Sequence, residues 1–235
     1  MVNLMMISPE TYYESSLKGK TKEEVLTKIR GLKKTIGHLK RVIESPEYGS
    51  IEIIQPDEQT QLWCSRLYLA RAIQAYEDAG GKYEPSKQEM QAIAFDKAIP
   101  DISKITLEIG GFFGGYETRT IQLHGNQLHL QVEHTIMRKP SDFDMEPDYP
   151  LTKEDFIEGL REVHIGEWHH SYNNWNVLDG TQWELTVEYN DGRKLSFNGS
   201  NAYPFSFNRL CELMGFDESD EDEEEDDEDD EDEEI

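Results

Sequence analysis

Cysteine is scarce in this chain of 235 residues. The two cysteines, Cys64 and Cys211, lie far apart and stand in none of the short paired spacings that hold zinc or form a redox centre. We therefore expect both to be reduced thiols in the protein core.

Long apolar runs are also lacking. No segment approaches the roughly 18 consecutive apolar residues that a membrane-spanning helix needs. Residues 1–6 are too few for the apolar part of a secretory signal, and no basic segment precedes them. Internal repeats and linkers rich in proline, glycine or serine are missing as well. These absences predict a cytoplasmic protein that makes no contact with a membrane.

Negative charge, in contrast, is abundant. The chain has 49 Asp and Glu residues against 23 Lys and Arg residues, a net charge of −26, and 17 of the acidic residues fall between Asp217 and Ile235. Such a run repels itself and has almost nothing apolar to bury, which predicts a disordered tail. The preceding residues have a net charge of −9 and enough length and aromatic side chains to bury a sizeable core.

The first hundred residues show the pattern of helices. Helix starts are recognisable at Ser8, Thr21 and Ser86, and a further helix fits Asp57 to Ala79. The strongest pattern lies in residues 25–43, where apolar residues recur at steps of three and four.

From Lys104 the apolar period changes to two residues, which is typical of strands, and three strands follow one another. Thr152 begins another helix, and a hairpin with its turn at residues 191–192 precedes a last helix at about 205–214. The sequence therefore predicts an α+β fold. Its parts are a helical N-terminal region (1–100), an antiparallel sheet of about five strands with packed helices (101–216) and a disordered acidic tail (217–235).

Patterns for catalysis or cofactor binding are weak. The glycine-rich segment Gly110–Gly115 joins two predicted strands and lacks the Gly-Lys-Ser/Thr ending of a phosphate-binding loop. The histidines that lie near Glu167 or on the predicted strands have no spacing that we can assign to a metal; they are His124, His129, His134, His164, His169 and His170. We predict no cofactor, no metal ligand and no catalytic residue.

A group of aromatic residues falls in loops or at element ends in the last folded part. Large rings beside amide side chains are typical of recognition surfaces. Such rings serve equally to anchor a loop to its own sheet. Both interpretations stay open for the binding candidates Trp168, Tyr172, Trp175 and Tyr203.

One basic island stands out in the acidic chain. Nine basic residues and only two acidic ones lie between Lys18 and Arg41, a local charge of +7. We expect its helical members to face solvent, where they could bind phosphates, an acidic partner or the protein's own tail. The net charge of −26 argues against direct nucleic-acid binding. The binding candidates in this island are Lys28, Arg30, Lys33, Lys34, Lys40 and Arg41.

Five segments carry a resemblance to a known group of proteins. They read ISPETYY (7–13), TKIRGLK (27–33), IGGFFGGYE (109–117), DGTQWEL (179–185) and GSNAYP (199–204). Together they resemble uncharacterised proteins of Gram-positive bacteria. The resemblance implies a bacterial, cytoplasmic protein and, because that family has no established activity, it assigns no catalytic residue.

Three functional hypotheses follow. The first is a non-enzymatic cytoplasmic interaction protein whose acidic tail binds a basic protein partner or the chain's own basic helix. The second is a nucleic-acid-mimicking inhibitor or anti-defence factor that acts through the tail. The third is a metal-dependent enzyme that uses the histidines. The sequence leaves the oligomeric state open.

Overall fold

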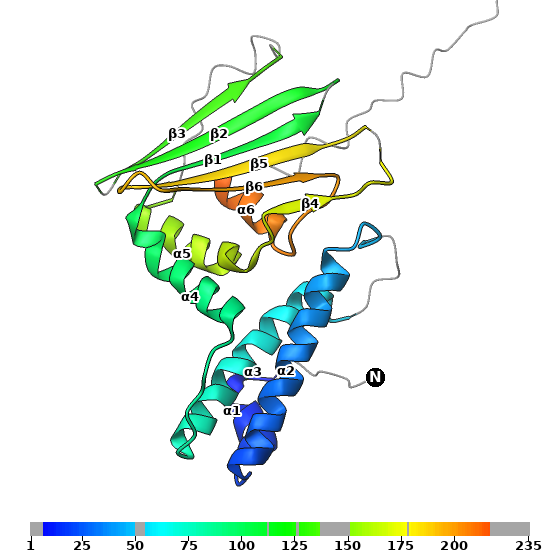
Figure 1. Cartoon of the computed structure of the whole chain (residues 1–235), viewed down its shortest axis with the longest axis vertical. Helices are drawn as coiled ribbons and strands as arrows, with labels where there is room; N and C mark the ends of the chain where they lie inside the picture. Colours follow the sequence, from blue (N-terminus) through cyan, green and yellow to red (C-terminus); the bar gives the residue numbers. More distant parts are fainter. Residues whose placement is uncertain are drawn as a thin grey trace, which may run out of the picture.

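The computed structural model describes residues 7–49, 55–111, 113–125, 127–136, 151–177 and 179–216. The acidic tail that we expect to be disordered, 217–235, lies outside these residues. Helices occupy the N-terminal part and a sheet with further helices follows, so the fold is α+β (Figure 1). The elements are α1 (Pro9–Tyr12), η1 (Tyr13–Leu17), α2 (Lys22–Ile43), α3 (Glu58–Asp78), α4 (Lys87–Ala98), η2 (Ile99–Asp101), β1 (Ile102–Gly111), β2 (Gly115–His124), β3 (Gln127–His134), α5 (Lys153–Val163), η4 (Ile165–Glu167), β4 (Ser171–Asn173), β5 (Gln182–Tyr189), β6 (Lys194–Ser200) and α6 (Phe207–Met214).

The helix starts read from the sequence are confirmed. Thr21 begins α2 with a capping box: its hydroxyl accepts a hydrogen bond from the backbone N–H of Glu24, whose carboxylate accepts one from the backbone N–H of Thr21. Ser86 and Glu89 repeat this arrangement at the start of α4. Each cap satisfies backbone donors that the helix itself leaves free, an effect of about 1 kcal/mol.

The strands form one six-stranded sheet in the order β3-β2-β1-β5-β6-β4. Five of them pair in antiparallel fashion, but β4 pairs with β6 in parallel, so the sheet is mixed. The predicted antiparallel sheet of about five strands is therefore wrong in strand number and in type. The reason is local: β4 has three residues, too few to show the alternating pattern by which a strand is recognised.

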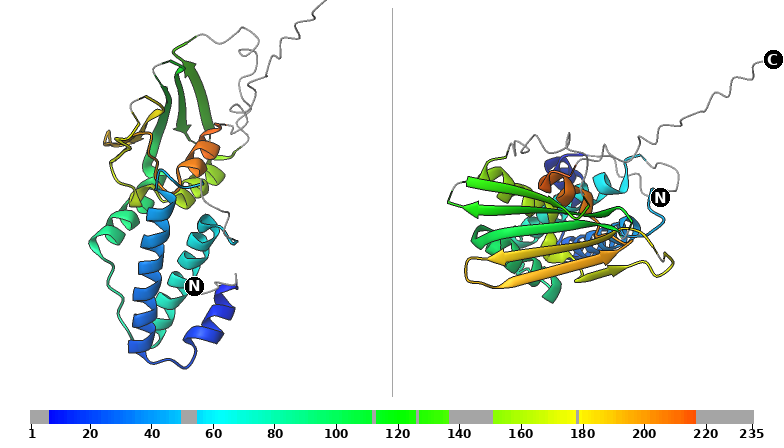
Figure 2. Two further views of the ribbon diagram at one scale, coloured as in Figure 1. Left: turned by 90° about the vertical axis from the view of Figure 1, so that its right-hand side faces the viewer. Right: turned by 90° about the horizontal axis from the view of Figure 1, so that it is seen from above.

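The sheet is covered on one face. Helices α5 and α6 pack against that face, and none of the described helices lies on the opposite face (Figures 1 and 2). Polar side chains meet in a row across the uncovered face, because Thr106 lies opposite both Thr120 and Thr186, and Thr186 lies opposite Ser196. This is the alternation expected of an antiparallel sheet with one solvated face.

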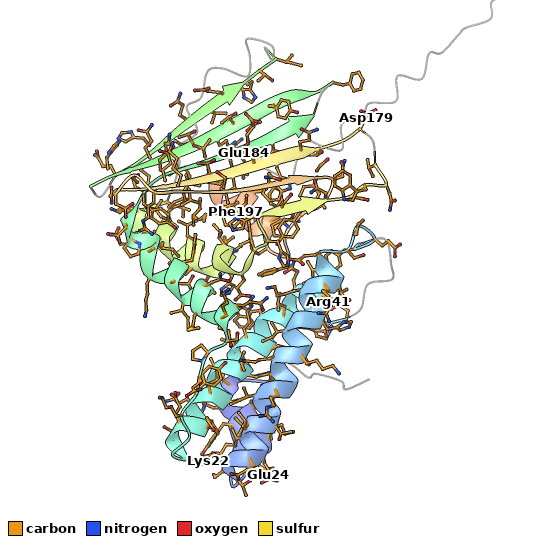
Figure 3. The ribbon with its side chains drawn as sticks, in the orientation of Figure 1. Lys22, Glu24, Arg41, Asp179, Glu184 and Phe197 are labelled. Carbon is orange, nitrogen blue, oxygen red and sulfur yellow. The ribbon has the colours of Figure 1, made fainter. Side chains whose placement is uncertain are left out.

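Helices α2 and α3 run side by side and extend away from the sheet as a helical pair (Figures 1 and 2). Its far part has a core of its own, which includes Val25, Ile29 and Ala72. Its near end joins the main core through Leu39 and Leu62. Figure 3 shows the direction of α2: Lys22 and Glu24 lie at the end far from the sheet, and Arg41 lies close to the sheet. Neither cysteine forms a disulfide, as predicted; Cys64 is buried and Cys211 is partly buried.

Candidate functional site

A cleft of about 810 Å³ lies where the helical pair meets the rest of the molecule. Helices α2, α3 and α4 and the short η4 segment line it. This volume lies within the range of small-molecule sites, and two groups with strongly lowered pKa values, His164 and Glu167, line the cleft. We call it the central cleft.

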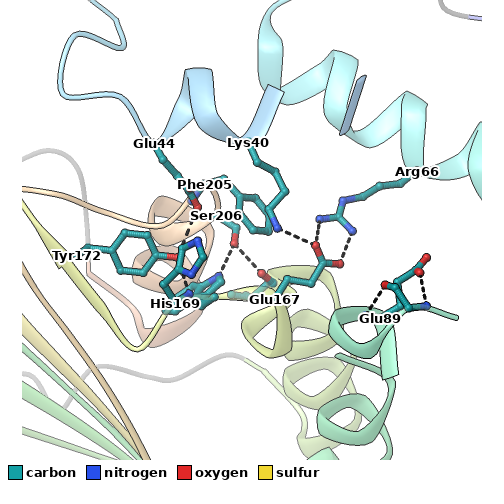
Figure 4. A network of polar contacts seen from close by, with 12 residues as sticks. Lys40, Glu44, Arg66, Glu89, Glu167, His169, Tyr172, Phe205 and Ser206 are labelled. Atoms are coloured by element: carbon teal, nitrogen blue, oxygen red, sulfur yellow. Dashed lines mark hydrogen bonds and ion pairs between the residues drawn. The ribbon is translucent and has the colours of Figure 1, made fainter. Parts of the chain in front are cut away.

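Glu167 is the centre of the polar network in the central cleft. Both of its carboxylate oxygens accept hydrogen bonds from the Arg66 guanidinium, at 2.7 and 2.9 Å, and the Lys40 ammonium lies 3.1 Å from Oε2. Figure 4 shows Lys40 and Arg66 pointing at Glu167 from two different helices. Burial alone would raise the pKa of Glu167, but the hydrogen bonds and charges of Arg66 and Lys40 prevail and hold it at about 2.

A second group of contacts ties the end of α2 to the loop before β4. The Tyr172 hydroxyl accepts a hydrogen bond from the backbone N–H of His169 at 2.9 Å and donates one to Glu44 at 3.4 Å. Glu44 also accepts from the backbone N–H of Phe205. Burial raises the pKa of Tyr172 above its ordinary value, so this side chain stays a neutral donor.

His164 and Asp96 also line the central cleft. His164 ends α5 in the left-handed conformation, φ 56°, which is strained for a residue other than glycine. Burial and the nearby Arg66 charge lower its pKa to about 4, so its imidazole is neutral at pH 7. Burial and the negative charge of Glu167 raise the pKa of Asp96. Among the described residues neither side chain has a hydrogen-bonding partner.

The structure divides the six binding candidates of the basic island into three groups. Lys33 and Lys40 point into the central cleft and form ion pairs with Glu89 and Glu167, at 2.6 and 3.1 Å. The expectation that these two bases face solvent is wrong, because acidic groups on α4 and η4 pack against that flank of α2. The other four are exposed: Lys28 lies on one flank, Arg30 and Lys34 lie on the outer face, and Arg41 lies beside them at the border of the central cleft.

The four aromatic candidates are also divided. Trp168 and Tyr172 are 7% and 8% exposed, and Trp168 packs edge-on against Trp183 and Phe197. The indole N–H of Trp168 donates to the Ser206 hydroxyl at 3.0 Å. Trp168 anchors the segment before β4 to the sheet, and Tyr172, within β4, packs against Trp183. Anchoring is one of the two roles left open above.

Trp175 and Tyr203 lie at the surface. Trp175 is 87% exposed and Tyr203 is 36% exposed, with its ring 4.9 Å from that of Phe207. Partner binding at the four aromatic residues stays a prediction, and only these two rings are accessible to a partner.

The histidines are dispersed. His170 stacks on Phe197, His134 lies beside Glu117, and the rings of His124 and His129 are 6.2 Å apart across β2 and β3. Within the part of the chain that the structure describes, no three or more His, Cys, Asp and Glu side chains lie close enough to hold a metal ion. The described helices also include none that is long and apolar enough to cross a membrane.

Sequence reasoning missed the partners that organise the cleft. Glu167 drew attention only as a neighbour of histidines, and Arg66 and Glu44 drew none. A charged residue among the apolar positions of α3 was the available signal for Arg66, because Leu62 and Leu69 lie on either side of it along the same helix. Its carboxylate partner is 101 residues away, and no local spacing identifies it.

Comparison with family models, curated proteins and solved structures finds no match to this chain. The resemblance to uncharacterised proteins of Gram-positive bacteria therefore stays a prediction. Function has to be argued from the residues themselves.

Proposed function

We propose that this is a non-enzymatic, cytoplasmic interaction protein that binds a basic protein partner through residues 217–235. The observation that carries the proposal is the presence of 17 carboxylates among these 19 residues. A polyanion of this density attracts a surface rich in lysine and arginine at long range and increases the rate of encounter. It recognises charge more than shape, so the partner class is a basic protein.

The chemistry of the central cleft supports the non-enzymatic part of the proposal. Its most buried acid, Glu167, already binds Arg66 and Lys40, and Glu44 already accepts two hydrogen bonds. These contacts join α2 and α3 to the sheet region. A network whose members bind each other across three elements has the character of a structural junction.

A variant that keeps the length of the tail but removes its charge tests the proposal. In this variant every Asp and Glu from 217 to 234 is replaced by its amide, so the tail keeps its length and loses its charge. We expect the natural chain to capture basic proteins from a bacterial lysate at about 50 mM salt and to release them at about 500 mM, where the Debye length is only a few ångströms. Capture of the same proteins by the amide variant would refute the proposal.

Nucleic-acid mimicry is the alternative that this experiment also addresses. A mimic occupies the basic groove of a nucleic-acid-binding protein, so duplex DNA must displace it. If the captured partners bind DNA and excess duplex releases them, the mimic is the better description. If duplex DNA has no effect on the captured proteins, the general basic-partner proposal stands and mimicry fails.

A further inference from the structure

Three basic residues form a stripe along the outer face of α2, and the last of them, Arg41, also borders the central cleft. A helix turns by about 100° per residue, so Arg30, Lys34 and Arg41 lie within about 40° of one another around its axis, on the side opposite the buried Val25 and Ile43. All three side chains are exposed, and none forms a hydrogen bond or ion pair with a described residue. We call this set the outer stripe.

No acid interrupts the outer stripe. Residues 30–41 contain five basic residues and no acidic one, and the two that point into the cleft, Lys33 and Lys40, have carboxylate partners there. The three bases of this segment that have no described ion pair therefore lie on one side of α2. They lie over about 17 Å of helix at 1.5 Å per residue.

Two glycines lie beside the outer stripe. A Cβ at Gly31 would meet nothing within 4 Å, and one at Gly37 would approach only the Arg41 side chain, at 3.9 Å. Internal packing therefore does not require glycine at either position, although glycine weakens a helix. Because these two positions have no side chain, nothing projects from the helix there, and an extended segment can lie close to the basic groups.

The acidic segment 217–235 is long enough to reach this surface. Residues 205–216 are mostly helical and extend over about 17 Å, and Phe205 at their start lies under the Lys40 ammonium, 4.5 Å from it. A path that starts at Phe216, returns to α2, passes around the helix and follows the outer stripe is therefore roughly 50 Å long. Nineteen extended residues extend over about 63 Å.

We propose that the acidic segment 217–235 of the same chain docks on the outer stripe of α2. Charge complementarity selects this occupant: the segment carries 17 carboxylates, and Arg30, Lys34 and Arg41 lie close together, exposed and without an ion pair to any described residue. Tethering supplies a high effective concentration, so weak individual ion pairs suffice. This inference adds regulation to the proposed function and rests on it in one respect, because a basic partner must displace the segment from the stripe.

Zero-length crosslinking of the full chain tests the docking. A carbodiimide joins a carboxylate to an amine in contact with it, and Lys34 is the one amine of the outer stripe. At low salt we expect the tryptic peptide that begins at Leu210, which contains the whole acidic segment, to be coupled to Lys34. Mixing isotope-labelled with unlabelled protein separates contacts within one chain from contacts between chains, and only the former fit the proposal.

Two variants provide the matched comparison. Arg30→Gln with Arg41→Gln keeps the reactive Lys34 and removes its neighbours, and we expect about a fivefold loss of the Lys34 crosslink, as for two exposed ion pairs. Lys22→Gln with Lys82→Gln removes the same charge from exposed positions off the stripe and should leave the crosslink unchanged.

Equal coupling of the segment to Lys22, Lys34 and Lys82, or coupling only between molecules, would overturn the docking. The crosslinking experiment and the capture experiment test the docking and the proposed function separately. A crosslink at Lys34 with no captured basic protein supports docking and refutes the function, and the reverse result refutes docking alone.

Discussion

The two sides of helix α2 carry the same kinds of basic side chain in opposite surroundings. On the cleft flank, Lys40 is one-fifth exposed and pairs with Glu167, which also holds Arg66. On the outer stripe, Lys34 is exposed and has no described partner. Basic residues in one helix thus separate into a group that joins the helical pair to the sheet and a group available to another molecule. Composition and local charge cannot make this distinction.

Removing the shared acid gives the largest expected effect. Glu167→Ala leaves Arg66 and Lys40 partly buried without a counter-charge, and we expect a loss of about 3 kcal/mol in the free energy of unfolding, measured in urea. The control is Glu158→Ala, because Glu158 is 66% exposed in its pair with Arg161 and should matter by less than about 0.5 kcal/mol. Similar losses in both variants would contradict a junction centred on Glu167.

The pH dependence of stability sharpens the same point. Folding lowers the pKa of Glu167 from an ordinary 4.5 to about 2. The contribution of its charge is therefore complete above pH 4.5 and is lost as the pH falls toward 2. We expect the stability difference between the natural chain and Glu167→Ala to shrink by roughly 2 kcal/mol across that range.

The difference between the two proteins cancels the contributions of other acids to the pH dependence of stability. One of these acids is Glu89, whose pKa is also about 2. Urea unfolding at pH 5, 4, 3 and 2.5 measures it. A difference that stays constant over this range would show that Glu167 acts through packing rather than charge.

Most elements of the fold could be predicted from the sequence, because their signals are local. The capping boxes at Thr21 and Ser86 and the turn at residues 191–192 each lie within four residues, and the structure confirms all three. The three-residue β4 could not be predicted, since its pairing with β6 is made entirely through tertiary contacts.

The central cleft was beyond prediction for the same reason. Its contacts join residues 56 to 161 positions apart. The outer stripe could be predicted in part. Helical spacing placed its bases on the surface of a helix, but only the structure shows that Lys33 pairs with an acid in the cleft whereas Lys34 is exposed.

Replacing one lysine on each side of α2 compares the two sides directly. Lys40→Met removes an ion pair with Glu167 and a cation–π contact with Phe205, and we expect a loss of about 1 kcal/mol. Lys34→Met makes the same chemical change on the outer stripe and should alter stability by less than about 0.3 kcal/mol. Urea unfolding of the two single variants measures both, and equal losses would remove the distinction between the two sides.

The smallest expected effect is a gain in stability on the outer side. Gly31 lies inside α2 with open space around its Cβ position, so Gly31→Ala should stabilise the protein by about 0.5–1 kcal/mol through helix propensity alone. Gly81→Ala is the matched control, because its Cβ would lie 2.4 Å from the Tyr76 ring and the substitution should destabilise. Thermal unfolding of both variants resolves the opposite signs. A loss of stability in Gly31→Ala would contradict the open space around the Cβ position of Gly31.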